Sequence, residues 1–126
     1  MNTETIAWTP EKIAATRLVL DRRAVRENLD RRGHRHREFL LIRIFPERDE
    51  KFDREDAGTV LDVLNEHARK DTDFPAPDLV LVSGGRICVA WLSNEEAPAS
   101  VVEDKERSLR QIVERVLRSQ YARAVN

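Results

Sequence analysis

The stretch APDLVLVSGGRICVAWLS, residues 76–93, has the strongest pattern in the chain and decides the expected fold. Two predicted strands, Leu79–Val82 and Arg86–Leu92, are joined by Gly84-Gly85. Paired glycines suit a tight turn whose central residues need positive φ, so the stretch predicts a β-hairpin. Both runs are almost continuously apolar instead of alternating, which indicates strands that are covered on both faces of a sheet.

A long helix is predicted near the N-terminus. Thr9 is placed to cap it, and Pro10 takes the first helical position, where its missing N–H costs nothing. The helix should run to about Arg32 and end at Gly33, which can adopt the left-handed C-terminal conformation. Its apolar residues form two stripes, which predicts contacts with both the sheet and a second subunit. The stripes are Ala14, Leu18, Val25 and Leu29 on one side, and Ile13, Leu20 and Ala24 on the other.

The remaining elements follow from their start and stop signals. Glu38 to Phe45 reads as a strand that Pro46 ends. Asp53 can cap a second helix over about 54–70. Ser100 and Glu103 fit a capping box for a last helix that runs to about Ala122. On the first helix, Arg17 and Asp21 are four residues apart and placed to pair.

The order α-β-α-β-β-α predicts a single-domain α/β (α+β) fold over residues 1–126, with residues 1–8 extended or disordered. The expected sheet is small, mostly apolar and covered by helices. Three strands leave two exposed edges, and proteins commonly protect such edges by pairing with a second copy. We therefore expect a homodimer whose sheet is completed by dimerisation.

Composition limits the classes of function. Of 126 residues, 40% are hydrophobic and 36% charged, with a formal net charge of −1, which is typical of a globular protein with an ionised surface. The single cysteine, Cys88, excludes an intrachain disulfide and a zinc site built from cysteines. The longest apolar run, residues 87–92, is too short to cross a bilayer, and no secretory signal is visible. A cytoplasmic location without a membrane partner is expected.

The quoted hairpin resembles the central strands of the PD-(D/E)XK nuclease superfamily, because Pro77-Asp78 opens its first strand. The resemblance implies a metal-dependent nuclease built around Asp78, with a second carboxylate and a lysine on the next strand. That position is Ala90–Leu92, which carries neither. The hairpin is also similar to the C-terminal part of a thioredoxin fold, but the chain has no Cys-X-X-Cys. We assign the chain to neither family and interpret Asp78 as a strand-start residue.

A metal reading of the histidines is also weighed. His34 and His36 alternate on an extended chain and could converge on an ion, with His67 as a third ligand. Four arginines surround the pair within residues 31–37, RRGHRHR, and repel a cation. Serine-hydrolase and nucleotide-binding motifs are absent. We therefore predict no metal, no cofactor and a non-catalytic binding module.

Charge arrangement gives the functional hypothesis. Residues 17–37 hold eight arginines and three acids, and arginine suits planar contact with phosphate or carboxylate. We predict an anion-binding patch that prefers nucleic acid. Its residues are Arg31, Arg32, His34, Arg35, His36 and Arg37. The alternative is a protein-interaction role, as an inhibitor, chaperone or immunity-type partner, through the acidic residues 47–56, with Glu47, Asp49 and Glu50 at the interface. A merely solvated arginine-rich helix face also fits the pattern.

Overall fold

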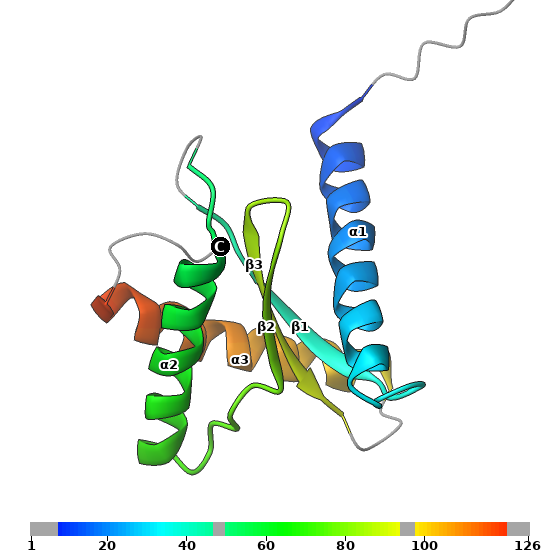
Figure 1. Ribbon diagram of the computed structural model, residues 1–126. Coiled ribbons are helices and arrows are strands. Elements are labelled where there is room, and N and C mark those ends of the chain that lie inside the picture. Colours follow the sequence, from blue (N-terminus) through cyan, green and yellow to red (C-terminus); the bar gives the residue numbers. More distant parts are fainter. Residues whose placement is uncertain (1–7, 47–49, 94–97, 121–126) are drawn as a thin grey trace, which may run out of the picture.

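The computed structural model describes residues 8–46, 50–93 and 98–120, with side chains described up to residue 117. These residues form three helices and a three-stranded antiparallel sheet in the predicted order (Figure 1). The elements are α1 (Pro10–Arg31), β1 (Phe39–Ile44), α2 (Arg54–Lys70), β2 (Leu79–Ser83), β3 (Arg86–Leu92) and α3 (Ala99–Gln120). The predicted helix end near Ala122 and residues 1–7 lie outside the described ranges. Within them, no helix combines the length and apolar composition of a membrane span.

Thr9 and Asp53 cap the first two helices as predicted. The Thr9 hydroxyl accepts a hydrogen bond from the Lys12 amide at 3.2 Å, and Pro10 takes the first helical position. Asp53 and Asp56 form a reciprocal capping box, in which each carboxylate accepts from the other's amide at 3.0 and 2.9 Å. Both caps satisfy amides that have no partner inside the helix.

The start of α3 differs from the prediction. The capping box expected from Ser100 and Glu103 is wrong, because the helix begins at Ala99 and places Ser100 inside its first turn. The Pro98 carbonyl instead accepts from the third and fourth helical amides, at 3.0 and 3.1 Å. These bonds use a backbone carbonyl, so the third helical amide is satisfied without a side-chain cap.

β3 is the central strand of the sheet, and both neighbours run antiparallel to it, in the order β1-β3-β2. The predicted hairpin is β2–β3. Gly84 and Gly85 have φ values of +57° and +79°, the sign that a type I′ turn needs at both central residues. Consequently β1 and β2 run parallel to each other on either side of β3, and α2 connects them (Figure 1).

Helices cover both faces of the sheet, as the continuously apolar strands predicted. α2 and α3 lie on one face and α1 on the other (Figure 1). The core under α2 and α3 includes Leu40, Ile42, Ile44, Leu64, Ile87, Val89, Trp91, Val113 and Leu117. The core under α1 includes Val25, Leu29, Leu41, Leu79, Cys88 and Ala90. Successive strand residues alternate between these two cores, as pleated strands require.

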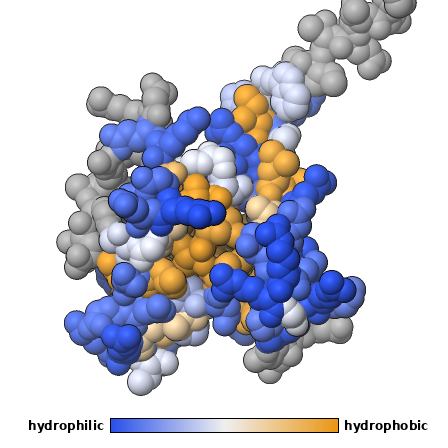
Figure 2. Space-filling model, viewed as in Figure 1, coloured by the Kyte–Doolittle hydropathy of each residue, from blue (hydrophilic) through white to orange (hydrophobic). Residues whose placement is uncertain are grey.

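The C-terminal half of α1 lies on the sheet, and its N-terminal half projects beyond it (Figure 1). Of the stripe formed by Ala14, Leu18, Val25 and Leu29, the last two are buried against the sheet, which confirms one of the two predicted contacts, while Ala14 and Leu18 are exposed. Apolar surface therefore appears along the projecting half in Figure 2. The exposed large apolar residues here are Trp8, Leu18, Val19 and Leu20.

Candidate functional site

The last residue of α1 and the loop after it hold the six predicted binding residues, and we call residues 31–37 the basic loop. Two hydrogen bonds end the helix: Gly33 N–H donates to the Asp30 carbonyl at 3.1 Å, and His34 N–H donates to the Leu29 carbonyl at 2.9 Å. Gly33 has a φ of +87°, the left-handed value predicted for it, which residues with side chains rarely adopt. This cap fixes the direction in which the basic loop leaves the helix.

Arg26 ties the basic loop to α1. Its guanidinium donates to the carbonyl of His34 at 2.6 Å and to the carbonyl of Arg37. Its Nε donates to the Asp30 carboxylate at 3.0 Å. One side chain therefore holds both halves of the loop, because the three nitrogens of the planar guanidinium donate to three separate acceptors. The sequence pattern showed Arg26 as one more surface cation and gave no sign of this role.

The basic loop presents most of its cationic side chains to solvent. Arg31, Arg32, Arg35 and His36 are exposed, while His34 and Arg37 are half-buried. His36 has a φ of +63°, an uncommon value for a residue with a side chain, in a turn where Arg37 N–H donates to the His34 carbonyl at 3.4 Å. The six predicted residues thus share one short, internally bonded loop.

The surface around this loop is more basic than a count along the sequence indicates. Asp21, one of the three acids in residues 17–37, is fully buried and bound by Arg86 and Arg43 from outside that segment. It therefore does not offset the surface arginines. The other two acids, Glu27 and Asp30, each pair with one arginine of α1.

The Asp21 cluster joins α1 to the sheet. Asp21 Oδ1 accepts from Arg86 Nη2 at 2.6 Å, and Oδ2 accepts from Arg86 Nε at 3.0 Å and from Arg43 Nη1 at 3.3 Å. Burial raises the pKa of Asp21, but hydrogen bonds from Arg86, Ser83 and Arg43 outweigh burial and hold the pKa below its usual value. Asp21 thus pairs with Arg86 and Arg43. The prediction from sequence spacing, a pair between Asp21 and Arg17, is wrong. The cluster fixes the helix that carries the basic loop.

The other predicted residues that the structure describes, Glu50, His67 and Asp78, lie outside the basic loop. Of the acidic interface, Glu50 is exposed, while Glu47 and Asp49 lie outside the described residues. His67 is on α2, where its ring packs edge-on against Phe74 at 5.2 Å. Across residues 8–46, 50–93 and 98–120, no three His, Cys, Asp or Glu side chains gather so that they could hold a metal ion.

Asp78 extends the β2–β3 hairpin. Its carboxylate accepts from the Leu92 amide at 2.7 Å, and its own amide donates to the Ala90 carbonyl at 2.9 Å. These bonds extend the pairing with β3 to the residue before Leu79, where β2 begins. Asp78 therefore has the strand-start role that we interpreted from the sequence. Asp78 also lines a hollow of about 680 Å³ beside α3, together with Asp73 and Asp104.

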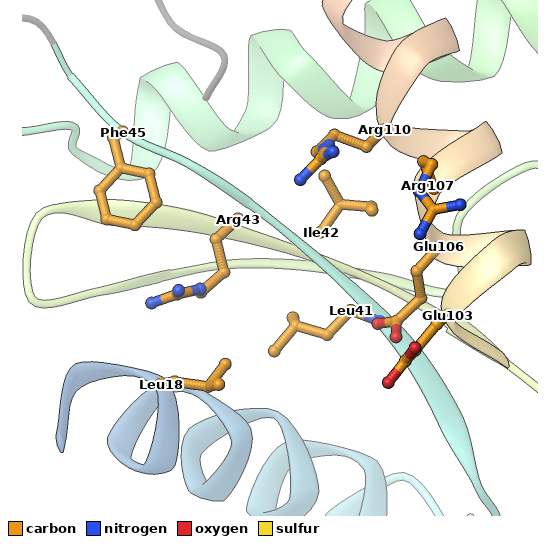
Figure 3. A pocket seen from close by; sticks show the side chains of 9 residues that line it. All are labelled: Leu18, Leu41, Ile42, Arg43, Phe45, Glu103, Glu106, Arg107 and Arg110. Carbon is orange, nitrogen blue, oxygen red and sulfur yellow. The ribbon is translucent and has the colours of Figure 1, made fainter. Parts of the chain in front are cut away.

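A second hollow, of about 360 Å³, follows the outer edge of β1 between α1 and α3 (Figure 3). We call it the β1 groove. Leu41 and Glu106 meet in it: the Leu41 amide donates to Glu106 Oε2 at 2.9 Å. The two residues are 65 positions apart, so no local pattern could predict this contact. The groove is lined by Leu18, Leu41, Ile42, Arg43, Phe45, Glu103, Glu106, Arg107 and Arg110.

No protein-family model, curated protein or solved structure matches this chain. The proposed function therefore rests on the geometry of the protein surface. The basic loop is the candidate site, because Arg26 holds its backbone while most of its cationic side chains are exposed.

Proposed function

We propose that this protein is a non-catalytic binding module whose basic loop grips the phosphate groups of nucleic acid. The proposal rests on the hydrogen bonds that Arg26 donates to two backbone carbonyls of the basic loop, those of His34 and Arg37. These bonds hold the loop in place while the side chains of Arg31, Arg32 and Arg35 stay exposed. A loop held in place by its scaffold loses little conformational entropy on binding. Each exposed guanidinium can then donate two parallel hydrogen bonds to the oxygens of one phosphate group.

Phosphate is favoured over a protein partner because the basic loop contains no apolar side chain. Protein interfaces take most of their affinity from buried aromatic and aliphatic anchors, whereas backbone contacts to nucleic acid come mainly from charge. The guanidinium groups of Arg22 and Arg26 each contact the ring of Phe39, with each guanidinium carbon 5.5 Å from its centre. Residues 31–37 contain no Phe, Tyr or Trp on which a base could stack, so weak sequence preference is expected.

The proposal includes a homodimer and a cytoplasmic location. Dimerisation is supported by the two sheet edges and by the exposed apolar residues of α1. A reducing compartment fits a chain with one cysteine, Cys88, which is buried and free.

Fluorescence anisotropy with a short labelled DNA duplex tests phosphate binding. The variant Arg31→Ala/Arg32→Ala/Arg35→Ala removes three exposed charges. If each of the three arginines contacts one phosphate, these contacts alone should make the affinity of the wild type fall about 40-fold between roughly 50 and 200 mM salt. The variant is expected to bind weakly and with a flatter salt dependence.

The matched control is Arg69→Ala/Lys70→Ala/Arg115→Ala, which removes the same charge from exposed positions on α2 and α3. It should bind as the wild type does. Equal binding by the wild type and the Arg31/Arg32/Arg35 variant contradicts the proposal. The alternative, a protein partner at the acidic segment, predicts capture of a protein that survives nuclease treatment and is lost on neutralising Glu47, Asp49 and Glu50.

A further inference from the structure

The outer edge of β1 has an amide bound by a side chain of α3. Leu41 N–H donates to Glu106 Oε2 at 2.9 Å, so it points away from β3. In an antiparallel pair, successive residues alternate between bonding to the neighbouring strand and facing outward. Phe39 and Arg43 therefore share the orientation of Leu41. β1 presents the backbone groups of these three residues along its outer edge, with Leu41 in the centre.

α3 carries a stripe of charge beside this edge. Glu103, Glu106, Arg107 and Arg110 all line the β1 groove, and their spacing places them on one side of the helix (Figure 3). The N-terminal half of this α3 charge stripe is acidic and the C-terminal half is basic. When two such helices run antiparallel, Glu103 of one faces Arg110 of the other, and Glu106 faces Arg107. The stripe is therefore complementary to its own copy.

We propose that a second copy of this chain docks along the β1 edge, about a twofold axis that passes Leu41 and the junction of Glu106 with Arg107. This interface rests on the dimerisation proposed above. The Leu41–Glu106 contact places the middle of the strand edge against the middle of the α3 charge stripe, so one axis serves both. A twofold interface requires this property, because each patch must match itself. The two three-stranded sheets then join into one.

Glu106 exchanges partners when the copies meet. In the single chain its carboxylate binds the Leu41 amide; in the pair that amide bonds to the opposite strand, and the carboxylate reaches the partner's Arg107. In the single chain, Arg107 Nη1 lies 3.2 Å from Oδ1 of the exposed Asp104. Exposed ion pairs of this kind contribute little to stability, so Arg107 can change partner at low cost. On the other face of the sheet, docking covers Leu18, an exposed apolar residue of the groove.

Charge reversal tests this interface by mass measurement in sedimentation equilibrium. Glu103→Arg/Glu106→Arg makes the α3 charge stripe wholly basic, and Arg107→Glu/Arg110→Glu makes it wholly acidic. The wild type is expected at about twice 14.6 kDa. Each variant alone should have a dimer dissociation constant raised about tenfold or more, because like charges face each other.

Two rescues separate charge matching from damage to the fold. An equimolar mixture of the basic and acidic variants should form a heterodimer, since every facing pair is again opposite in charge. The fourfold variant Glu103→Arg/Glu106→Arg/Arg107→Glu/Arg110→Glu has the inverted stripe and should dimerise by itself. Failure of both rescues, with circular dichroism showing folded chains, overturns the interface.

The matched control is Asp62→Arg/Glu66→Arg, which makes the same charge change at exposed positions on α2 and should leave the dimer intact. A wild type that sediments at 14.6 kDa at all concentrations overturns both the dimer and this interface. A wild-type dimer whose two reversed variants also remain dimeric overturns the interface alone. DNA binding by the basic loop is measured separately on the wild type, so its loss counts against the proposed function and not against the interface.

Discussion

Asp21 on α1 and Arg86 on β3 form a two-point ion pair, with Oδ1–Nη2 and Oδ2–Nε distances of 2.6 and 3.0 Å. The aspartate is fully buried, and the arginine side chain is 11% exposed. Burying charges is costly, and here the cost is offset by two directional bonds and by a third from Arg43. The pair therefore sets where α1 sits on the sheet, and with it the position of the basic loop.

Removing one partner of this pair should be strongly destabilising. Asp21→Asn keeps the size of the side chain but leaves the charges of Arg86 and Arg43 without a counter-ion. The expected loss in free energy of unfolding is about 3–5 kcal/mol, measured by urea denaturation. Asp104→Asn, which breaks the exposed pair with Arg107, is the control and should change stability by less than about 0.5 kcal/mol. Similar losses in both variants would contradict a special role for Asp21.

Stability should fall in acid through the same residue. The pKa of Asp21 in the folded protein lies below its usual value of 3.8, so the unfolded chain takes up the proton first. The stabilisation is present above about pH 5 and is lost as the pH falls through 3.8 toward the lowered pKa. The difference in unfolding free energy between the wild type and Asp21→Asn should therefore shrink between about pH 5 and 3. A difference that stays constant over this range would count against the lowered pKa.

Cys88 should be unreactive in the folded protein. Its side chain is fully buried, and burial, together with the charge of Asp21, raises the pKa of its thiol to about 12. At pH near 8, modification by an aromatic disulfide reagent should be at least ~100-fold slower than in denaturant, where the thiol is exposed. Absorbance of the released thiolate measures both rates, and Cys88→Ala gives the background. Fast modification of the folded chain would show that β3 opens readily.

Much of the fold could be predicted from local signals. The β2–β3 hairpin follows from Gly84-Gly85 between apolar runs, and the ends of α1 and α2 follow from Thr9, Gly33 and Asp53, because turns and caps depend on residues a few positions apart. The start of α3 was missed, since a proline carbonyl can serve where a capping side chain was expected. The part of α1 that the sheet covers could not be predicted, because a stripe shows which residues share a side of the helix but not how far the sheet extends along it.

The candidate sites were predictable in part. The basic loop is visible as RRGHRHR, but the arginine that holds it, Arg26, looks like its neighbours until its acceptors, the carbonyls of His34 and Arg37, are placed. The contact between Asp21 and Arg86, like that between Leu41 and Glu106, joins residues 65 positions apart. Such pairs depend on how the helices pack on the sheet, and the periodicity of residues within a single helix or strand does not predict that packing.

The role of Arg26 can be tested without removing charge. Arg26→Lys keeps the cation but loses the fork that binds the carbonyls of His34 and Arg37, so the basic loop should loosen. Affinity for a DNA duplex should fall about 3- to 10-fold because ordering the loop then costs entropy, while the slope of affinity against salt stays the same, since the same phosphates are contacted. Arg23→Lys, at an exposed position on the same helix, should bind as the wild type does. Wild-type affinity in Arg26→Lys, or a flatter salt slope, would show that Arg26 does not position the loop.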